Sequence, residues 1–550
     1  MAVLCKLMRL HWLAYPLILS LTSLSFYGLI SFGDEGFDTA LLQDSYFYSI
    51  LGFTLKQALL SALLSVGLAI PIARTLYFFP DLPAKKLFLT FCLLCFVTPT
   101  LIVITGLVAL LGRSGFMTPW LDSFCNTFMD SSWNLYGLSG ILIAHIFMNM
   151  PLAVRIIYLQ LQTIPDNSWK LASQLKLNQG QRFRLIEWPV LRSSGLLLLC
   201  FIFVLCFNSF AVVLALGGGP QSTTLEVAIY QALKYDFNIP EALTLAWTQL
   251  LVAGGLYWLI TRAGGLSWQS VESNQYLWRP KHNSASTRRA MIIYALSWCV
   301  LLLPYLSLLP GLFNSELAGK DIRAIGHSAL ISVALAVITA LLAMAVAFAL
   351  LQPIRQAALG GYVKRMWLYE SMATHALVAP AMVLSVGLFV YLLPRIDLER
   401  WGIIFVVILN TALVIPFAVQ KLKPRLLQFD QQYNRLARSL KLTRGTRWQI
   451  EWPFIQEIYL ATLGLVLVLA MGDVAIFSIF GTPEWTTLPW LIYGYASSYR
   501  ITEASTASFI LLALCAAFLF LLEKYTVSRP TPIENKTPGR QPQYEGNTHA

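Results

Sequence analysis

The chain has 550 residues, of which 57% are hydrophobic and only 12% charged, and its net charge is +12. Soluble proteins carry about a quarter charged residues, so a mean hydropathy of +0.64 excludes an ordinary soluble enzyme or binding domain. The positive charges lie in short loops between apolar stretches, which is typical of membrane proteins and gives no reason to expect a nucleic-acid partner. The sequence therefore predicts an all-α polytopic membrane protein surrounded by lipid.

About twelve stretches are long and apolar enough to cross the membrane, which takes about 20 helical residues. In chain order they lie at 11–31, 50–73, 87–111, 137–160, 194–216, 241–261, 290–313, 326–351, 371–394, 401–421, 457–480 and 501–523. The first follows Lys6 and Arg9 and has no small-residue cleavage site, so we expect a retained span and not a cleaved signal peptide.

The loops between these spans alternate in charge. The 32–49 loop holds acidic residues and no Lys or Arg, whereas the 161–193 and 422–456 loops are strongly basic. By the positive-inside rule, both termini and both basic loops face the cytoplasm, and the 217–240 and 481–500 loops face outward. The predicted division of the chain is a first transmembrane helix with a periplasmic segment (1–45), a first permease domain (46–262), a linker with the seventh helix (263–320), a second permease domain (321–525) and a disordered cytoplasmic tail (526–550).

Sites for cofactors or metals are not expected in this chain. It contains no G-x-x-x-x-G-K-[ST] phosphate loop, so ATP would have to be used by a separate subunit. Most of the eight cysteines lie inside apolar segments, and the Cys92-x-x-Cys95 pair has no nearby His or carboxylate to complete a metal or redox site.

A short polar passage occurs twice. "LASQLKLNQG", beginning at Leu171, returns 265 residues later as "LARSLKLTRG", beginning at Leu436, with six of ten positions identical. "MPLAVR" (150–155) matches "IPFAVQ" (415–420) at the same offset. A repeat of this length indicates a duplicated bundle of five or six spans. Because an even number of spans separates the copies, the repeat is parallel, and a substrate path would lie between the halves.

Each copy of this passage predicts a short amphipathic helix on a basic surface. Leu171, Ala172 and Leu175 fall near one helical face, and Gly180 is expected to end the helix in a left-handed conformation. A basic and aromatic run then leads to Pro189. Such a segment could dock into a groove on a soluble partner, or it could lie on anionic lipid headgroups.

This duplicated loop resembles the coupling loop of binding-protein-dependent ABC importer permeases. That loop reads E-A-A-x-x-x-G, followed about a dozen residues later by an apolar residue, any residue, Leu and Pro. Ala172 and Ala437 match the second alanine, and 186–189 and 450–453 match the closing motif with Trp in place of Leu. The sequence departs from this pattern in three ways. Lys170 and Arg435 stand where the glutamate is expected, and Lys176 and Lys441 stand where the glycine is expected. The first copy also has one more residue than the second between its glycine, Gly180, and its "EWP" at 187–189.

The resemblance implies a type I ABC importer permease fold in two parallel repeats, located in the bacterial inner membrane. It also implies a periplasmic substrate-binding protein and two copies of a cytoplasmic ATPase as partners. The residues assigned to ATPase coupling are Leu171, Ala172, Leu175, Gly180, Arg182, Glu187, Leu436, Ala437, Leu440, Gly445, Arg447 and Glu451. The four leucines are the expected apolar knobs. The two arginines would either pair with acidic edges of the ATPase grooves or only set the orientation of the loops.

Ionisable residues inside spans are expensive and point to function. Asp473, beside Gly472, is the clearest, and it would either ease a cation along the path or pack between helices. We place Asn208 and His145 on the same candidate path, although a buried histidine is also common as a structural residue. The candidate periplasmic gate or binding-protein contacts are Gly217, Gly218, Gly219 and Glu226.

Longer stretches resemble thiamine permeases in particular, among them "SFAVVLALGGGPQSTTLEVAIYQALKYD" (209–236) and "MGDVAIFSIFG" (471–481). Ferric iron permeases share the general plan and stay open as the alternative. An ion-driven secondary transporter would want buried acidic or histidine relays in several spans, and a membrane enzyme would want paired carboxylates or a metal motif. This sequence offers little of either, so an importer permease is the favoured function.

Overall fold

The computed structural model describes residues 11–31, 38, 40–129, 132–262, 284–312, 319–375 and 381–527, and all regular secondary structure in these ranges is helical. This confirms the all-α prediction. Seven of the described helices are long and apolar enough to cross a membrane, or nine if each sharply bent pair is counted as one span. The expected number of about twelve stays a prediction. The proposed N-terminal charges, the linker residues 263–283 and 313–318, and the tail beyond 527 lie outside the described residues.

The first half is built from seven longer helices and several short ones. The longer ones are α2 (His11–Ser31), α3 (Ser45–Phe78), α4 (Lys85–Val97), α5 (Thr100–Leu111), α7 (Leu138–Gln162), α10 (Trp188–Phe207) and α13 (Ile239–Arg262). The short ones are η1 (Leu41–Gln43), α6 (Thr118–Met129), α8 (Asp166–Gln174), α9 (Gln179–Arg182), η2 (Phe183–Glu187), α11 (Ala211–Leu216), η3 (Pro220–Ser222) and α12 (Leu225–Lys234).

The second half follows the same order. Its helices are α14 (Ser284–Leu306), α15 (Leu309–Leu312), α16 (Gly319–Leu359), α17 (Val363–Thr374), α18 (Ala381–Leu392), α19 (Leu398–Ser439), α20 (Arg444–Met471), α21 (Ala475–Phe480), η5 (Pro483–Trp485), α22 (Leu488–Ser497) and α23 (Ile501–Val527). In each half the main packing is the same, since α3 packs on α7 and α10 as α16 packs on α19 and α20.

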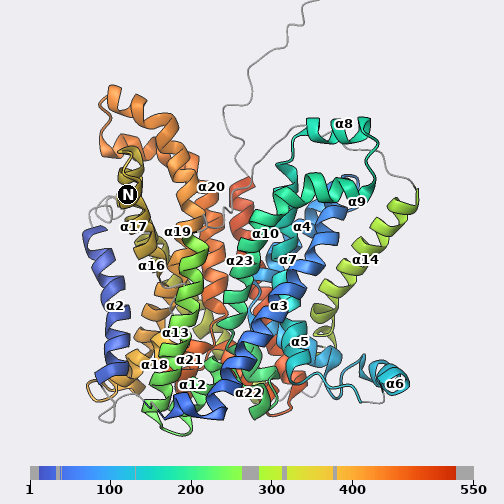
Figure 1. Cartoon of the computed structure of the whole chain (residues 1–550). Helices are drawn as coiled ribbons and strands as arrows, with labels where there is room; N and C mark the ends of the chain where they lie inside the picture. Colours follow the sequence, from blue (N-terminus) through green and yellow to red (C-terminus); the bar gives the residue numbers. More distant parts are fainter. Residues whose placement is uncertain are drawn as a thin grey trace, which may run out of the picture.

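The two halves are parallel copies of one another. Figure 1 shows α8 and the turn between α19 and α20 at one end of the bundle, and α12 and α22 at the other. The two halves also contain equivalent hydrogen bonds. Thr54 Oγ1 of α3 accepts from the backbone N of Leu225 at 3.1 Å, and Ser332 Oγ of α16 accepts from the backbone N of Leu488 at 2.7 Å. Both bonds hold the first turn of the short outer-end helix, so the parallel repeat is confirmed.

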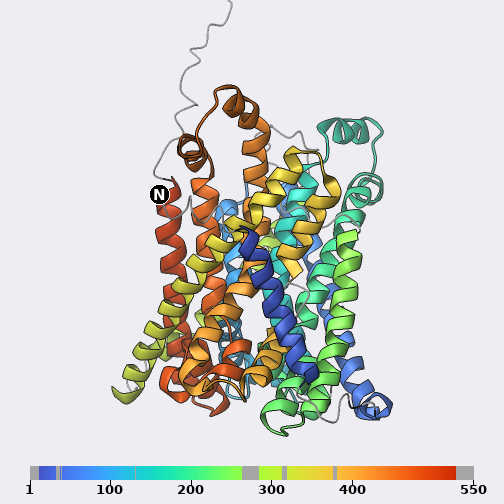
Figure 2. The ribbon, with the colours of Figure 1, turned by 90° about the vertical axis from the view of Figure 1, so that its left-hand side faces the viewer.

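Each half also lends one helix to the other. The N-terminal α2 packs on α18, α16 and α17 of the second half, whereas α14 packs on α5 and α3 of the first half. Figure 2 shows α2, in blue, lying against the yellow and orange helices. Small residues allow these close crossings. A Cβ on Gly28 would clash with the carbonyl oxygen of Gly387, and a Cβ on Gly106 would clash with that of Pro304.

Several predicted spans are broken helices. The 87–111 stretch, expected as one span, is the pair α4 and α5, bent by 102° around Thr98 and Pro99. Proline has no amide hydrogen and restricts the residue before it, so the helix cannot run through this point. The 194–216 stretch breaks after α10, and the 457–480 stretch breaks between Met471 and Ala475. Composition alone hid these breaks because the chain stays apolar on both sides of each.

We expect Gly28→Leu to loosen the contact between α2 and the second half. The added side chain has no room against Gly387, so the free energy of unfolding should fall by about 1–3 kcal/mol. The measurement is the melting temperature of the purified protein. Gly52→Leu is the matched control, because Gly52 is a helical glycine whose Cβ would meet no atom within 4 Å. Equal melting temperatures for the two variants would contradict the tight crossing.

Candidate functional site

The first copy of the repeated passage forms a helical elbow, defined here as residues 166–187. Helix α8 closes with two backbone hydrogen bonds, from Leu175 N to Leu171 O at 2.9 Å and from Leu177 N to Ala172 O at 3.0 Å. This is the pattern of a helix that ends through a left-handed residue. The chain then enters α9 and η2, which lead into the long helix α10.

The second copy, residues 430–451, forms a second elbow with the same closing bonds. Leu440 N donates to Leu436 O at 2.9 Å, and Leu442 N donates to Ala437 O at 3.1 Å. Here the preceding helix is the end of α19 and the following helix is α20. The two elbows therefore share one backbone conformation, although only six of ten residues are identical.

The residue that ends each helix is a lysine, and the prediction that Gly180 does so is wrong. Lys176 and Lys441 have φ angles of +51° and +46°, which is the left-handed region. Gly180 and Gly445 instead lie in the first turn of the next helix. The lysines occupy the position where the importer permease loop carries glycine. This chain therefore keeps the left-handed turn, although that conformation is more strained for lysine than for glycine.

Capping side chains fix the second arm of each elbow. Asn178 accepts from Gln181 N at 2.8 Å while Gln181 Oε1 accepts from Asn178 N at 2.9 Å, a reciprocal capping box. In the second elbow Thr443 Oγ1 accepts from Thr446 N at 3.3 Å. Asn178 and Thr443 are equivalent positions of the repeat, and both are residue types that commonly cap the start of a helix. The start of the second arm could therefore have been predicted from the sequence.

The four expected knobs are all exposed. Leu171 and Leu175 are 56% and 63% exposed, and Leu436 and Leu440 are 56% and 60% exposed. Ala172, between the first two, is buried instead. Each elbow thus shows a pair of leucines to its surroundings at one end of the molecule, which is the geometry needed to fill a groove on another protein.

An ion pair between an arginine and a buried glutamate ties each elbow to a long helix of its half, α3 or α16. Arg74 Nε of α3 donates to Glu187 Oε2 at 2.6 Å, and Arg355 Nη1 of α16 donates to Glu451 Oε1 at 2.6 Å. Both glutamates belong to the repeated "EWP" and are buried. Sequence reasoning chose the glutamates and missed the arginines. The missed signal was that each arginine stands near the elbow end of the corresponding helix.

The first elbow has an additional aromatic anchor. Trp169, a fully buried residue of α8, donates from its indole nitrogen to the hydroxyl of Tyr77 at 2.9 Å. Its ring also packs edge-on against Phe78, with centroids 5.3 Å apart. Both partners lie in the last turn of α3. This half therefore adds aromatic packing to the ion pair that holds its elbow to α3.

The second elbow replaces this aromatic anchor by a network of charges. Asp430 is buried and accepts from Arg355 at 2.6 and 2.8 Å and from Arg447 Nη2 at 2.6 Å. Arg447 also donates to Asn434, which stands where the first elbow has Trp169. Arg447 is thus paired within the chain. Neither role expected for it, at a groove edge or as an orientation charge only, included this partner.

The extra residue of the first copy has a definite place. Residues Phe183–Glu187 form a single π-helical turn, whereas the equivalent part of α20 is regular α-helix. One inserted residue widens a helical turn in this way without breaking the helix. The insertion is absorbed before Glu187, so both glutamates still reach their arginines.

A second group of polar residues lies deeper in the bundle, at the helix breaks. His145 of α7 bonds Ser61 Oγ at 3.0 Å and Ser209 Oγ at 2.9 Å. By the repeat, Asn410 corresponds to His145 and Asp473 to Ser209. Asn410 and Asp473 line the same small space at the second break. Each break thus has one polar side chain of the neighbouring long helix beside it, His145 in the first half and Asn410 in the second.

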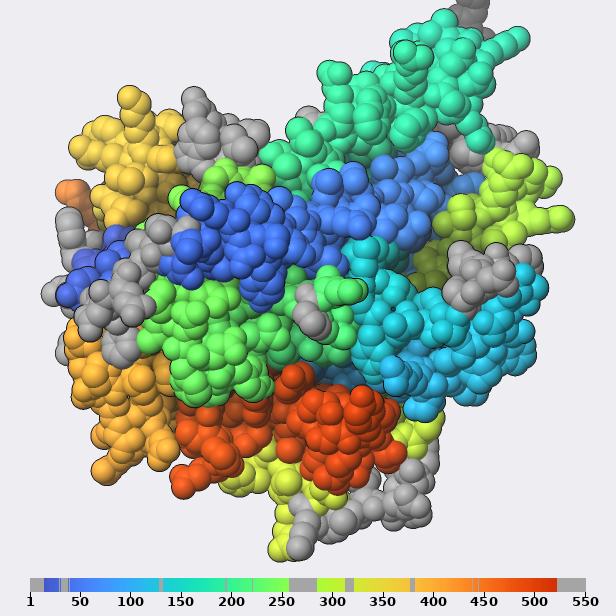
Figure 3. Space-filling model, turned by 60° about the horizontal axis from the view of Figure 1, so that its bottom comes forward, coloured from blue at the N-terminus to red at the C-terminus, as the bar shows by residue number. Residues whose placement is uncertain are grey.

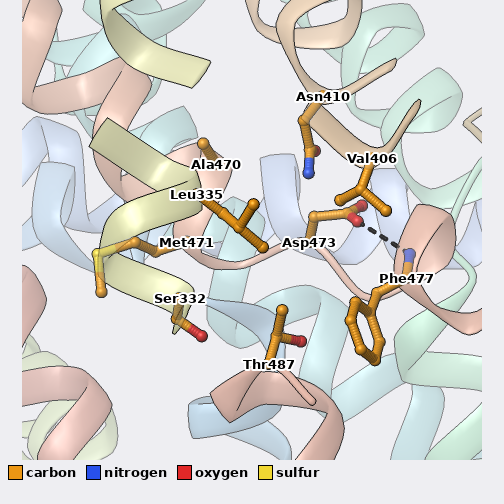
Figure 4. Close-up of a pocket in the computed structure, with 9 residues that line it drawn as sticks. All are labelled: Ser332, Leu335, Val406, Asn410, Ala470, Met471, Asp473, Phe477 and Thr487. Carbon is orange, nitrogen blue, oxygen red and sulfur yellow. Dashed lines mark hydrogen bonds between the residues drawn. The ribbon is translucent and has the colours of Figure 1, made fainter. Parts of the chain in front are cut away.

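A small cavity opens at the break of the second half (Figure 4). Its lining residues are Ser332, Leu335, Val406, Asn410, Ala470, Met471, Asp473, Phe477 and Thr487. Asp473 Oδ2 accepts from the backbone N of Phe477 at 3.4 Å. The neighbouring Gly472 faces the first half, where a Cβ would lie 3.2 Å from Pro99. The cavity therefore sits close to the boundary between the halves.

Two residues predicted for the gate and the path both contact Gln249. Glu226, expected at the gate or as a contact of the binding protein, is only 1% exposed and accepts from Gln249 Nε2 at 2.7 Å. The segment 217–240 is not an open loop, because α12 occupies part of it and buries its first turn. Glu226 is therefore not a surface contact in this conformation, and its role at the gate stays a prediction. Asn208, expected on the path, accepts from Gln249 at 3.3 Å. Gly218 and Gly219, with φ of +72° and +137°, form an exposed tight turn.

Comparison with known proteins assigns the class. Residues 65–261 match the model of the binding-protein-dependent transport system inner membrane component family. The thiamine transport system permease protein ThiP of Brucella abortus (strain 2308) is 35% identical over 501 residues, covering 90% of this chain and 91% of the relative. The chain therefore belongs to the family of binding-protein-dependent inner-membrane ABC permeases, whose partners include a substrate-binding protein and an ATPase.

Within this class, the thiamine permeases match over nearly the whole length. ThiP of Haemophilus influenzae (strain Rd) is 35% identical over 529 residues, covering 94% of this chain and 96% of the relative. The ferric transport system permease protein FbpB of Actinobacillus pleuropneumoniae is 32% identical over 142 residues, only 26% of this chain. The thiamine and ferric permeases are thus similar in percentage identity to this chain, but the thiamine permeases align over far more of its length.

We expect Lys176→Gly to stabilise the first elbow by about 0.5–1 kcal/mol, because glycine adopts a positive φ without strain. Lys170→Gly is the matched control. It makes the same substitution at an exposed helical position of α8 and should destabilise by about 1 kcal/mol. The measurement is the melting temperature together with the rate of protease cleavage in the elbow. A lower melting temperature for Lys176→Gly would contradict the left-handed turn.

We expect Arg355→Met to be more destabilising than Arg74→Met. The first change removes a partner from two buried carboxylates, Asp430, which keeps Arg447, and Glu451, which loses its 2.6 Å contact. Removing one member of a buried pair costs about 3–5 kcal/mol. Arg74 is itself 32% exposed, so water can replace part of its contact with Glu187. Melting temperature and membrane abundance are the measurements. Adding Glu187→Gln to Arg74→Met should restore part of the loss, and a failure to do so would count against the ion pair.

Proposed function

We propose that this chain is the membrane-spanning subunit of an ATP-driven thiamine importer. It receives thiamine from a periplasmic substrate-binding protein and is driven by two copies of a cytoplasmic ATPase, one at each elbow. The observation that carries the coupling proposal is the pair of elbows, which share one backbone conformation and stand at the same end of the bundle with exposed leucines. Two equivalent surfaces suit two equivalent partner subunits.

The elbow end is assigned to the cytoplasm. It carries the basic residues of both loops, and α2 begins and α23 ends there (Figure 1). An excess of Lys and Arg in short loops marks the cytoplasmic side. Both termini are then cytoplasmic, and α12 and α22 lie at the periplasmic side, where the binding protein would deliver thiamine.

The elbows convert movement of the ATPase into movement of the halves. When the ATPase dimer closes, it pushes on the four leucines, and the elbow cannot slide freely because its glutamate is bound to an arginine of α3 or α16. Those helices pack along α7 and α10, or along α19 and α20. The whole half therefore moves with its elbow, and the two halves rotate about their common axis. This chain binds no ATP in the proposal and acts as a permease, with no catalytic role.

Thiamine as the substrate rests on the relatives. The alignments with permeases named for thiamine transport cover 88% or more of this chain, and the alignment with the one named for ferric iron covers about a quarter. Ferric iron is therefore the weaker candidate and is kept as an arm of the experiment.

We expect the double variant Leu175→Glu with Leu440→Glu to abolish thiamine uptake. A charged group at each knob would have to enter an apolar groove without a partner, at a cost of several kcal/mol. The measurement is uptake of labelled thiamine, beside labelled ferric iron, in cells that lack this chain and are restored with each variant. The mass of the purified complex reports whether two ATPase copies are bound.

The matched control changes the same leucines to methionine, which keeps the knobs apolar and should retain uptake. Uptake that survives the glutamate variant would rule out the elbows as docking sites. Restoration of iron uptake in place of thiamine would overturn the substrate and leave the coupling intact. A complex with one ATPase copy would contradict the proposed stoichiometry.

A further inference from the structure

The carboxylate of Asp473 lacks an obvious partner of opposite charge. The described residues contain ion pairs around Asp321, Glu370, Asp430, Glu451 and others, but none that includes Asp473. Its surroundings are neutral: Oδ2 accepts from the backbone N of Phe477 in α21, and Asn410 lines the same cavity. An unpaired charge within a membrane bundle is costly, and such residues usually serve a ligand or a path.

The fold itself does not require a charge at this position. In the first half the same helix break carries Ser209, a neutral residue bonded to His145 at 2.9 Å. The two breaks are otherwise equivalent, each with a short helix after it that leads to the periplasmic-side turn. At this position the second half therefore carries a carboxylate where the first half, related by the pseudo-two-fold axis, carries a neutral hydroxyl. This asymmetry suits a single charged molecule better than a structural role common to both halves.

The other lining groups favour an aromatic cation. Phe477 contributes a ring to the cavity, and a cation over an aromatic face gains about 0.5–2 kcal/mol. Thr487 lines the same cavity, is 7% exposed, and its hydroxyl has no hydrogen-bond partner within the described part of the chain. A buried hydroxyl without a partner costs about 1–3 kcal/mol, which a bound ligand can offset. Figure 4 shows Asp473, Phe477 and Thr487 around the same space.

The location suits a molecule that arrives from the periplasmic side. The break lies at the far end of α20 from the elbow, and α21 and α22 follow it toward the face shown in Figure 3. On that face the green segment around α12 and the orange-red segment around α22 lie next to each other, so both halves contribute to this surface. Gly472 meets Pro99 of the other half, and movement between the halves would therefore change the size of the cavity.

We propose that Asp473, Phe477 and Thr487 form a transient subsite for the positively charged ring of the substrate, with Asn410 orienting the carboxylate. This inference rests on the proposed function, because thiamine carries a permanent positive charge on its thiazolium ring. The cavity is small in this conformation, so the subsite takes the ring when the halves separate and releases it as they close.

The test is the initial rate of labelled thiamine uptake at saturating concentration, in cells that lack this chain and carry each variant. Asp473→Asn keeps the shape and can still accept from the Phe477 amide, so it removes mainly the charge. Its maximal rate should fall ten- to a hundredfold, the size of one lost charge-assisted contact. Asp473→Glu should keep most of the rate. Ser209→Thr, at the equivalent position of the first half, keeps the hydroxyl that bonds His145, so it is the matched control and should transport as the wild type.

Thr487→Val separates a ligand contact from a structural one. Removing an unpartnered buried hydroxyl should leave the melting temperature unchanged or raise it, while uptake falls several-fold. This variant gives an answer even if Asp473→Asn folds poorly. Wild-type uptake rates for both Asp473→Asn and Thr487→Val would overturn the subsite. So would uptake rates in Asp473→Glu and Ser209→Thr that fall as far as the rate in Asp473→Asn. Failure of the wild type itself to restore thiamine uptake would overturn the proposed function instead, so the two failures are distinguishable.

Discussion

The buried pairing of an arginine with the glutamate of each elbow is the interaction on which the rest of the coupling depends. A carboxylate taken out of water is tolerable only while its partner is in place. Glu187 and Glu451 therefore hold α3 and α16 at a fixed distance from the elbow turns, at 2.6 Å between charged atoms. Because those two helices make the largest contacts within their halves, a force on the exposed leucines reaches the whole half and is not lost in a flexible loop.

The two halves reach the same geometry by different chemistry. Trp169 and Tyr77 anchor the first elbow by packing and one hydrogen bond. In the second elbow, Asp430 instead accepts hydrogen bonds from two arginines, Arg355 and Arg447. The aromatic anchor is apolar and insensitive to charge screening. The ionic one is buried deeply enough that salt weakens it little, although it loses much if any member is removed. What the two elbows share is backbone conformation and exposed leucines, and those are the features that an identical partner on each side would meet.

Local and repeated features of the fold could be predicted from the sequence, whereas long-range contacts could not. Hydrophobic runs located the helices, and the repeat predicted two equivalent elbows with the same leucines exposed. The turn residue was misassigned to Gly180, because glycine is the usual left-handed residue and the actual one, Lys176, gives no such signal. The burial of Glu226 was missed because a segment between two spans looks like a loop whether or not a helix folds back into it. The partner of Glu187 lies 113 residues away, and no local pattern points to it.

The helix breaks connect the elbows to the proposed subsite. Inside a membrane every backbone group freed by a break needs a partner, and Asp473 supplies one by accepting from the backbone N of Phe477. The neighbouring long helices contribute His145, which bonds Ser209 at the first break, and Asn410, which lines the cavity with Asp473 at the second. Those helices, α7 and α19, lead to the two elbows at their other ends. A push at an elbow therefore shifts the side chains that hold the break, and the contact of Gly472 with Pro99 means that the break cannot shift without moving against the other half. The position of Asp473 at such a break explains how a distant ATPase can change the surroundings of a carboxylate that it never touches.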